Sequence, residues 1–203
     1  MSPRYRLFRR TMIRLCRLLF GYTLHGGDRV PAEGPLIIAS NHSQYADPVL
    51  VCVAVPRRVQ WMGKKELFVL PLRTFFHFIG TFPVDREGGG RAAIRAALAS
   101  LAEGWALGIF PEGTHRGDES SKQAKSGAVV LASRGNAPIL PVHVGRLPGP
   151  LGRLRGGRLH VYVGEPIELD PTLRGGAAYR AKAEEIMRSI YALPQRYGQG
   201  DSP

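Results

Sequence analysis

A histidine and an aspartate stand close together in the segment 41–47, which reads Asn-His-Ser-Gln-Tyr-Ala-Asp. This segment follows an apolar run and leads into residues of helical composition, so His42 and Asp47 can fold back to face each other. An imidazole with an ordinary pKa of about 6.5 can accept a proton from a hydroxyl near neutral pH. A carboxylate on its other nitrogen fixes the tautomer and stabilises the imidazolium. The pair predicts general-base chemistry. Because Ser43 is adjacent to His42, the alternative that this serine acts as an enzyme nucleophile stays open.

Asp47 also has a purely structural interpretation. The dipeptide Asp47-Pro48 predicts a helix start, with the aspartate as N-cap and the proline at the first helical position. A histidine and an aspartate at this spacing occur by chance in many chains. The catalytic interpretation therefore needs support from other segments.

The segment 80–86, Gly-Thr-Phe-Pro-Val-Asp-Arg, predicts a strand that delivers Arg86 at its end. A guanidinium presents a fixed fork of donors that suits a phosphate group. The alternative is a surface arginine paired with a neighbouring carboxylate.

The segment 110–116, Phe-Pro-Glu-Gly-Thr-His-Arg, also follows a predicted strand and holds an acid, a hydroxyl and two potential cations. Lys125, before Gly127 at the next helix, can add charge and amide donors for an anion. A carboxylate is a poor ligand for an anion. We therefore expect Glu112 to organise Arg86 or Arg116, or to contact a substrate hydroxyl.

A fourth segment, 137–142, is an apolar strand with two prolines that limit ladder pairing. We expect this strand to have a purely structural role. The alternative is that it contacts an acyl chain or thioester.

The composition predicts one folded domain with an affinity for anions. The chain has 203 residues, 44% of them hydrophobic, and a formal net charge of +12. Nucleic acid, anionic lipid and phosphorylated substrates all fit this charge. We expect no nucleic-acid partner, because the aromatic residues are not interleaved with basic ones as stacking platforms. Cys16 and Cys52 lie in apolar stretches without metal or redox spacing, which predicts buried reduced thiols.

Residues 4–20 carry six arginines and no acid, and at helical periodicity they divide into two faces. We expect residues 1–22 to form a basic amphipathic helix at an anionic membrane surface, ahead of an α/β domain at 23–203. The alternative is a helix whose apolar stripe packs on the domain. No apolar stretch approaches the length of about 18–20 residues that spans a bilayer. Arg14 and Arg17 interrupt the apolar stretch that a signal peptide needs, so we expect no cleaved signal. The apolar face comprises Phe8, Met12, Leu15, Cys16 and Leu19, and the opposite face Arg6, Arg10, Arg14 and Arg17.

After this helix, short apolar runs alternate with helical periods, which predicts a mixed, largely parallel sheet covered by helices. The segments with chemistry follow predicted strands, where ligands gather in open α/β sheets. The predicted strands are 36–40, 59–62, 81–84, 106–110, 139–144 and 158–163, and the predicted helices begin at Asp47 or span 91–103, 122–134 and 179–191.

Taken together and in this order, the four segments between about Pro35 and Val144 resemble the glycerolipid and lysophospholipid acyltransferase family. The resemblance implies that His42 is a general base and Asp47 its partner. It implies transfer of a fatty acyl group from acyl-CoA or acyl carrier protein to the sn-2 hydroxyl of lysophosphatidic acid, without a metal or tightly bound cofactor. It also implies that the acceptor phosphate is bound by Gly80, Arg86, Glu112, Gly113, Thr114 and Arg116, with Lys125 and Gly127 as a Lys-x-Gly block.

The sequence departs from the family pattern at two places. Gln44 stands where many relatives have serine, and His115 precedes Arg116 where many have arginine directly. The resemblance implies an enzyme attached peripherally to the cytoplasmic face of the cell membrane, with the lipid surface and a lysophospholipid as partners. Another acceptor, either glycerol 3-phosphate or a lysolipid without phosphate, remains an alternative. A basic protein that binds lipid or nucleic acid without catalysis is a second alternative.

Overall fold

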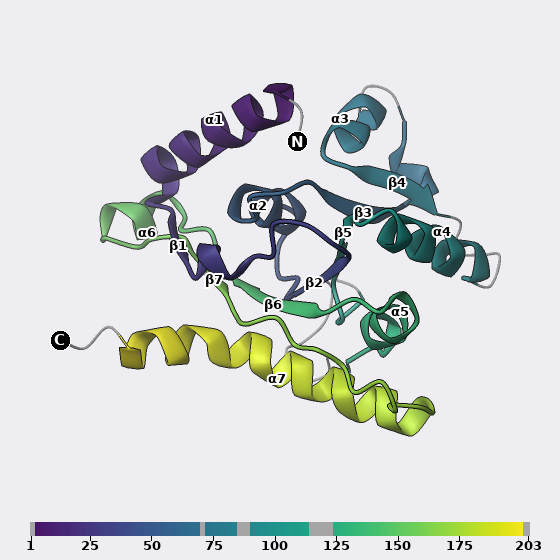
Figure 1. Ribbon diagram of the computed structural model, residues 1–203. Coiled ribbons are helices and arrows are strands. Elements are labelled where there is room, and N and C mark those ends of the chain that lie inside the picture. Colours follow the sequence, from purple (N-terminus) through teal and green to yellow (C-terminus); the bar gives the residue numbers. More distant parts are fainter. Residues whose placement is uncertain (1–2, 70–71, 85–89, 114–123, 201–203) are drawn as a thin grey trace.

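The apolar runs of the sequence form a seven-stranded sheet with helices on both faces in the computed structural model (Figure 1). The structure describes residues 3–69, 72–84, 90–113 and 124–200 of the chain. The strands are β1 (Thr23–His25), β2 (Leu36–Ser40), β3 (Val59–Lys64), β4 (Thr81–Val84), β5 (Ala106–Ile109), β6 (Ile139–Val144) and β7 (His160–Val163). The α-helices are α1 (Pro3–Phe20), α2 (Asp47–Ala54), α3 (Leu72–Phe78), α4 (Arg91–Ala102), α5 (Gly127–Gly135), α6 (Pro150–Leu154) and α7 (Gly176–Gly200).

The strand order is β1-β7-β6-β2-β5-β3-β4. Strands β6, β2, β5, β3 and β4 are mutually parallel, β7 runs antiparallel to β6, and β1 pairs parallel with β7. This confirms the predicted single α/β domain with a mixed, largely parallel sheet. The five parallel strands end at one edge of the sheet, so the loops after β2 and β5 come together there.

The alternation of side chains along β2 divides the core into two layers. Leu36 and Ile38 face one layer, where they pack with residues of α1 and α2. Ile37 and Ala39 face the other layer, where they pack with residues of α4, α5 and α7. Because all five residues of β2 are buried, this strand lies at the centre of the domain.

Most predicted elements are present, with differences at their ends. Strands 36–40, 81–84 and 139–144 have the predicted bounds, and α7 extends the helix predicted at 179–191 in both directions. Helix α5 begins at Gly127, later than predicted, and residues 122–123 lie outside the described part of the chain. Three elements, β1, α3 and α6, were not predicted. They span only 3, 7 and 5 residues, too few to show a periodicity.

The two-faced interpretation of α1 is wrong in part. Its apolar stripe is divided, because Cys16 is buried and Met12 packs against the core, whereas Leu15 and Leu19 are exposed. The helix packs on α2 through one side, as the alternative had it. Its outward side nevertheless carries further leucines among the arginines. None of the described helices combines the length and the apolar character needed to cross a bilayer.

Candidate active site

The loop after β2 holds His42 and Asp47 in direct contact. Nδ1 of His42 lies 3.1 Å from Oδ2 of Asp47. The same oxygen accepts hydrogen bonds from the backbone N–H groups of Ser43 at 2.7 Å and Gln44 at 2.9 Å. Asp47 is fully buried, with 0% of its side chain exposed. The loop therefore wraps around one carboxylate oxygen, which fixes the imidazole relative to the start of α2.

The predicted capping role of Asp47 is wrong. Helix α2 begins at Asp47, its N-cap residue is Ala46, and no side chain caps it. The carboxylate turns away from the helix amides and binds N–H groups that precede the helix. The structural interpretation of Asp47 is thereby replaced by one centred on His42.

The imidazole of His42 is also held by an aromatic stack. The ring lies on Phe110, with centroids 4.0 Å apart and an interplanar angle of 16°. Phe110 stacks in turn on Trp61 at 4.9 Å. Gly108 makes room for this stack, because a Cβ there would lie 2.5 Å from the Trp61 ring. Since Nδ1 faces Asp47, Nε2 lies on the opposite side of a ring whose side chain is 15% exposed.

Ser43 does not pair with His42 as a nucleophile. Its buried hydroxyl has no hydrogen-bond partner in the described part of the chain. Its backbone N–H is instead directed at Asp47. The arrangement fits a base that acts on a substrate hydroxyl.

Glu112 is the second buried acid of the site, 6% exposed. Its Oε1 accepts a hydrogen bond of 2.6 Å from the Tyr191 hydroxyl on α7 and one of 3.4 Å from the backbone N–H of His42. Glu112 thus joins the loop after β2 to α7. Tyr191 was missed by the sequence analysis, because 79 residues separate it from Glu112 and nothing in its local pattern marks it.

Two side-chain amides fasten the same loop to the chain that leaves β6. Asn41 donates to the carbonyl of Val144 at 2.9 Å and accepts from its N–H at 2.7 Å. Gln44 donates to the carbonyl of Gly145 at 3.1 Å and accepts from the N–H of Leu147 at 3.2 Å. The departure from the family pattern at Gln44 therefore has a structural role.

His143 on β6 lies near enough to Asp47 and Glu112 for their charges to act on it. Burial lowers the pKa of His143, and this effect outweighs the Ile190 carbonyl, Asp47 and Glu112, which raise it. Its ring contacts that of Tyr191 edge-on, with centroids 5.7 Å apart. The lowered pKa of His143 favours its neutral imidazole.

The residues predicted to bind the acceptor phosphate are described only in part. Gly113 has a φ of +81°, and a Cβ there would lie 2.4 Å from Nζ of Lys125, so the two predicted residues lie together. The backbone N–H of Lys125 donates to the carbonyl of Pro111 at 2.9 Å. Gly127 is the first residue of α5. Three predicted residues, Arg86, Thr114 and Arg116, lie outside the described residues.

Gly80 does not belong with this group. It lies just before β4, at the opposite end of that strand from the site, and the ladder pairs Thr81 with Trp61. Its φ is +90°, and a Cβ would lie 2.3 Å from the carbonyl oxygen of Val59. Close backbone packing against β3 explains the glycine, which corrects the predicted role in substrate binding.

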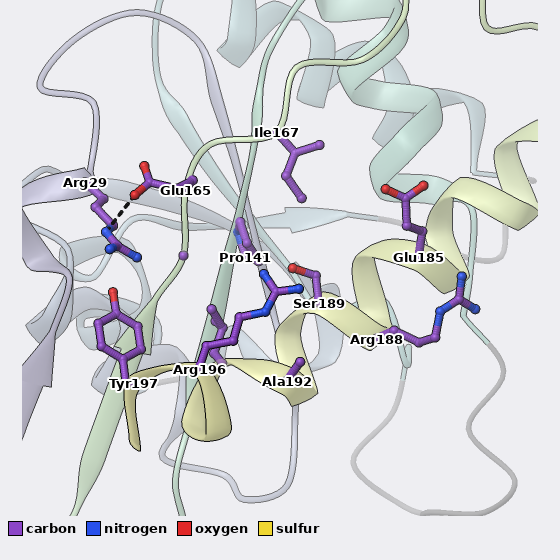
Figure 2. A pocket seen from close by; sticks show the side chains of 12 residues that line it. Arg29, Pro141, Glu165, Ile167, Glu185, Arg188, Ser189, Ala192, Arg196 and Tyr197 are labelled. Carbon is purple, nitrogen blue, oxygen red and sulfur yellow. Dashed lines mark ion pairs between the residues drawn. The ribbon is translucent and has the colours of Figure 1, made fainter. Parts of the chain in front are cut away.

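A separate cavity lies away from these residues. It has a volume of about 460 Å³ and opens between α7 and the segment after β7 (Figure 2). Arg29 and Glu165 form an ion pair of 2.9 Å at its rim, and Arg188 and Arg196 come from α7. None of the predicted site residues lines it. Across residues 3–69, 72–84, 90–113 and 124–200, no three His, Cys, Asp or Glu side chains are grouped as metal ligands.

A histidine paired with a buried aspartate at the carboxyl edge of a largely parallel sheet is the arrangement of an enzyme with a His-Asp base, and comparison with known families agrees. The Acyltransferase family model matches residues 21–145, so the chain belongs to the acyltransferase family.

Sequence similarity to known acyltransferases extends over most of the chain. The chain is 30% identical over 178 residues to 1-acyl-sn-glycerol-3-phosphate acyltransferase of Bacillus subtilis, covering 87% of this chain and 86% of that protein. It is 29% identical over 152 residues to the protein of that name from Streptococcus pneumoniae, of which it spans 55%. The crystal structure of the LPA acyltransferase PlsC from Thermotoga maritima superimposes with a TM-score of 0.72 over 94% of this chain and 79% of that one, at 21% identity, and shows the shared fold.

Proposed function

We propose that the protein transfers a fatty acyl group from a thioester to the sn-2 hydroxyl of lysophosphatidic acid and so forms phosphatidic acid. The contact between His42 and the buried Asp47 is the observation that carries this proposal. The relatives from Bacillus subtilis and Streptococcus pneumoniae are 1-acyl-sn-glycerol-3-phosphate acyltransferases, which supports this acceptor. Acyl-CoA and acyl carrier protein are both proposed as donors.

The transfer is direct and needs one base. Because Nδ1 donates its proton to Asp47, Nε2 carries the lone pair that takes the proton from the sn-2 hydroxyl. The hydroxyl oxygen attacks the thioester carbonyl, the carbon–sulfur bond breaks, and the imidazolium returns its proton to the leaving thiolate. The products are an ester and a thiol. General-base assistance of this kind contributes about 10²–10⁴-fold.

The phosphate of the acceptor is held next to this base in the proposal. Lys125 over Gly113 supplies charge close to Glu112. Arg86, Thr114, Arg116 and Gly127 are assigned to the same anion from the sequence. Binding of the phosphate places the hydroxyl beside His42, which is a gain from positioning. Replacing Arg86 with alanine should mainly raise KM, and an unchanged KM would count against this assignment.

Residues 1–22 are proposed as an interfacial segment on the domain formed by 23–203, at the cytoplasmic face of the membrane. The outward side of α1 exposes Leu7, Leu15, Leu18 and Leu19. A helix of this kind, with exposed leucines among arginines, suits an anionic lipid interface. Vesicle co-sedimentation with and without residues 1–20 tests it, since equal binding would remove α1 from the account.

The reaction itself is tested by thiol release from acyl-CoA and from acyl carrier protein, with lysophosphatidic acid as acceptor and phosphatidic acid identified as product. Glycerol 3-phosphate and monoacylglycerol serve as comparison acceptors. Faster turnover with lysophosphatidic acid supports the proposal. Equal turnover with monoacylglycerol would contradict the phosphate-binding assignment, and silence with every acceptor would contradict acyl transfer.

A further inference from the structure

The segment 146–158 between β6 and β7 lies beyond the end of the family match at residue 145. It contains α6, on which Leu151 and Leu154 expose 61% and 84% of their surface. Its charged residues are four arginines, Arg146, Arg153, Arg155 and Arg158, and it contains no acid. A short helix that exposes leucines among arginines has no evident role in the fold of an isolated domain.

This segment lies beside the carboxyl end of α1 (Figure 1). The backbone N–H of Leu159 donates to the carbonyl of Phe20 at 2.9 Å. A Cβ on Gly21 would lie 3.1 Å from Cγ of Arg158 and 3.3 Å from Cζ of Arg153. Leu147, which leads into α6, packs on the same core layer as Met12 and Cys16 of α1. The exposed leucines of α6 and of α1 therefore lie on the same side of the sheet.

The charges around these leucines select the partner. From residue 124 to residue 164 the chain holds no acid, and residues 1–27 hold none either. Arginine side chains can lay their stems on an apolar surface while their guanidinium groups reach phosphate oxygens. Each cation close to an anionic leaflet adds to binding, and exposed leucines enter the boundary between headgroups and acyl chains. Both features match an anionic phospholipid surface.

We propose that the segment 146–158 is a second contact with the surface of an anionic bilayer, next to α1. The side chain of Gln44 forms hydrogen bonds with the backbone of Gly145 and Leu147, where this segment begins. The segment is therefore fastened to the loop that carries His42. Docking of α6 on lipid sets the height of the base above the headgroups from which an acceptor would be drawn.

The inference deepens the proposed function, but vesicle binding is measured without acyl donor or acceptor. The full-length chain is sedimented with vesicles of phosphatidylcholine, with or without phosphatidylglycerol, as wild type and as the double variant Leu151→Ser, Leu154→Ser. We expect the double variant to bind the anionic vesicles about tenfold more weakly. Thermal melting of both proteins verifies that the variant is folded.

A second pair of variants separates the arginines of α6 from the charge of the whole chain. Arg153→Ser with Arg155→Ser should weaken binding to anionic vesicles, whereas Arg174→Ser with Arg180→Ser should weaken it less for the same change in charge. Equal losses from the two pairs would overturn the assignment.

Two other outcomes would also overturn it. Wild-type binding by the leucine variant would show that α6 does not touch lipid. A dimer in buffer that the leucine substitutions convert to a monomer, with vesicle binding unchanged, would show that a second copy of the chain covers this surface. Failure of acyl transfer with intact, leucine-dependent vesicle binding would contradict the proposed function alone.

Discussion

The two helical layers of the domain expose different side chains to their surroundings. The layer of α1, α3 and α6 exposes Leu7, Leu18, Phe75, Leu151 and Leu154, with arginines between several of them. On the opposite layer, α7 exposes Tyr191 and mixes charges of both signs, such as the Lys182–Glu185 pair at 2.9 Å. One layer suits contact with a lipid surface and the other suits water.

The loop after β2, which carries His42, lies between these layers and contacts both. It leads into α2 on the first layer through Asp47, and Gln44 ties it to the segment that leads to α6. Glu112 connects it to Tyr191 of the second layer. In the proposed mechanism, the first layer supplies the base and the second layer supports it. Variants at each connection test this division.

The largest effect is expected at the connection to α2. Asp47→Asn keeps the shape of the side chain but removes the charge that stabilises the imidazolium of His42, and kcat should fall about 10²–10⁴-fold. The measurement is steady-state thiol release with phosphatidic acid as the product. Asp170→Asn, a change of the same kind at an exposed aspartate, is the matched control and should leave kcat unchanged. A kcat for Asp47→Asn near that of the wild type would remove Asp47 from the mechanism.

The next effect concerns the connection to β6. Asn41→Ala leaves the buried N–H and carbonyl of Val144 without their side-chain partners, and should lower the free energy of unfolding by about 2–4 kcal/mol. Urea unfolding measures the loss. Gln44→Ala, at a half-buried site, should cost about 1 kcal/mol. A larger loss at Gln44 than at Asn41 would reverse the importance assigned to the two amides.

A smaller effect is expected at the connection to the second layer. Tyr191→Phe keeps the ring next to His143 but removes the hydrogen bond to Glu112. Because this bond acts on His42 only through Glu112, kcat should fall several-fold, by less than the factor of about 10 or more that a whole charge-assisted hydrogen bond is worth. The matched control is Tyr179→Phe on the same helix, whose hydroxyl lies 3.4 Å from Ser133. Equal effects of the two substitutions would show that α7 does not support the site.

The smallest effect is a dependence of stability on pH. Because burial lowers the pKa of His143 in the folded state, the unfolded chain binds more protons, and stability falls as the pH drops below the unfolded value of about 6.5. Urea unfolding at about pH 7.5 and about pH 5.5 should show this loss. His143→Gln should reduce the dependence, and His160, whose pKa burial also lowers, should preserve part of it. An undiminished dependence in the variant would contradict the role of His143.

The sequence predicted those features whose causes are local. Strands β2, β4 and β6 follow from apolar runs, and the contact of His42 with Asp47 follows from a short loop before a helix start. The bonds between Asn41 and Val144 join residues 103 positions apart, and local patterns contain no trace of them. Helical periodicity showed that α1 is amphipathic but not which side packs on α2. The sequence pattern grouped Gly80 with Arg86, whereas the close approach of β3 explains why a glycine stands at this position.

Single-turnover acyl transfer with His42→Ala at saturating lysophosphatidic acid tests whether Nε2 of His42 is the base. His77→Ala, at an exposed histidine on α3, is the matched control. We expect His42→Ala to lose transfer about 10²–10⁴-fold, with lysolipid binding and thermal stability retained, and His77→Ala to match the wild type. Transfer by His42→Ala at the rate of the wild type would show that His42 is not the base.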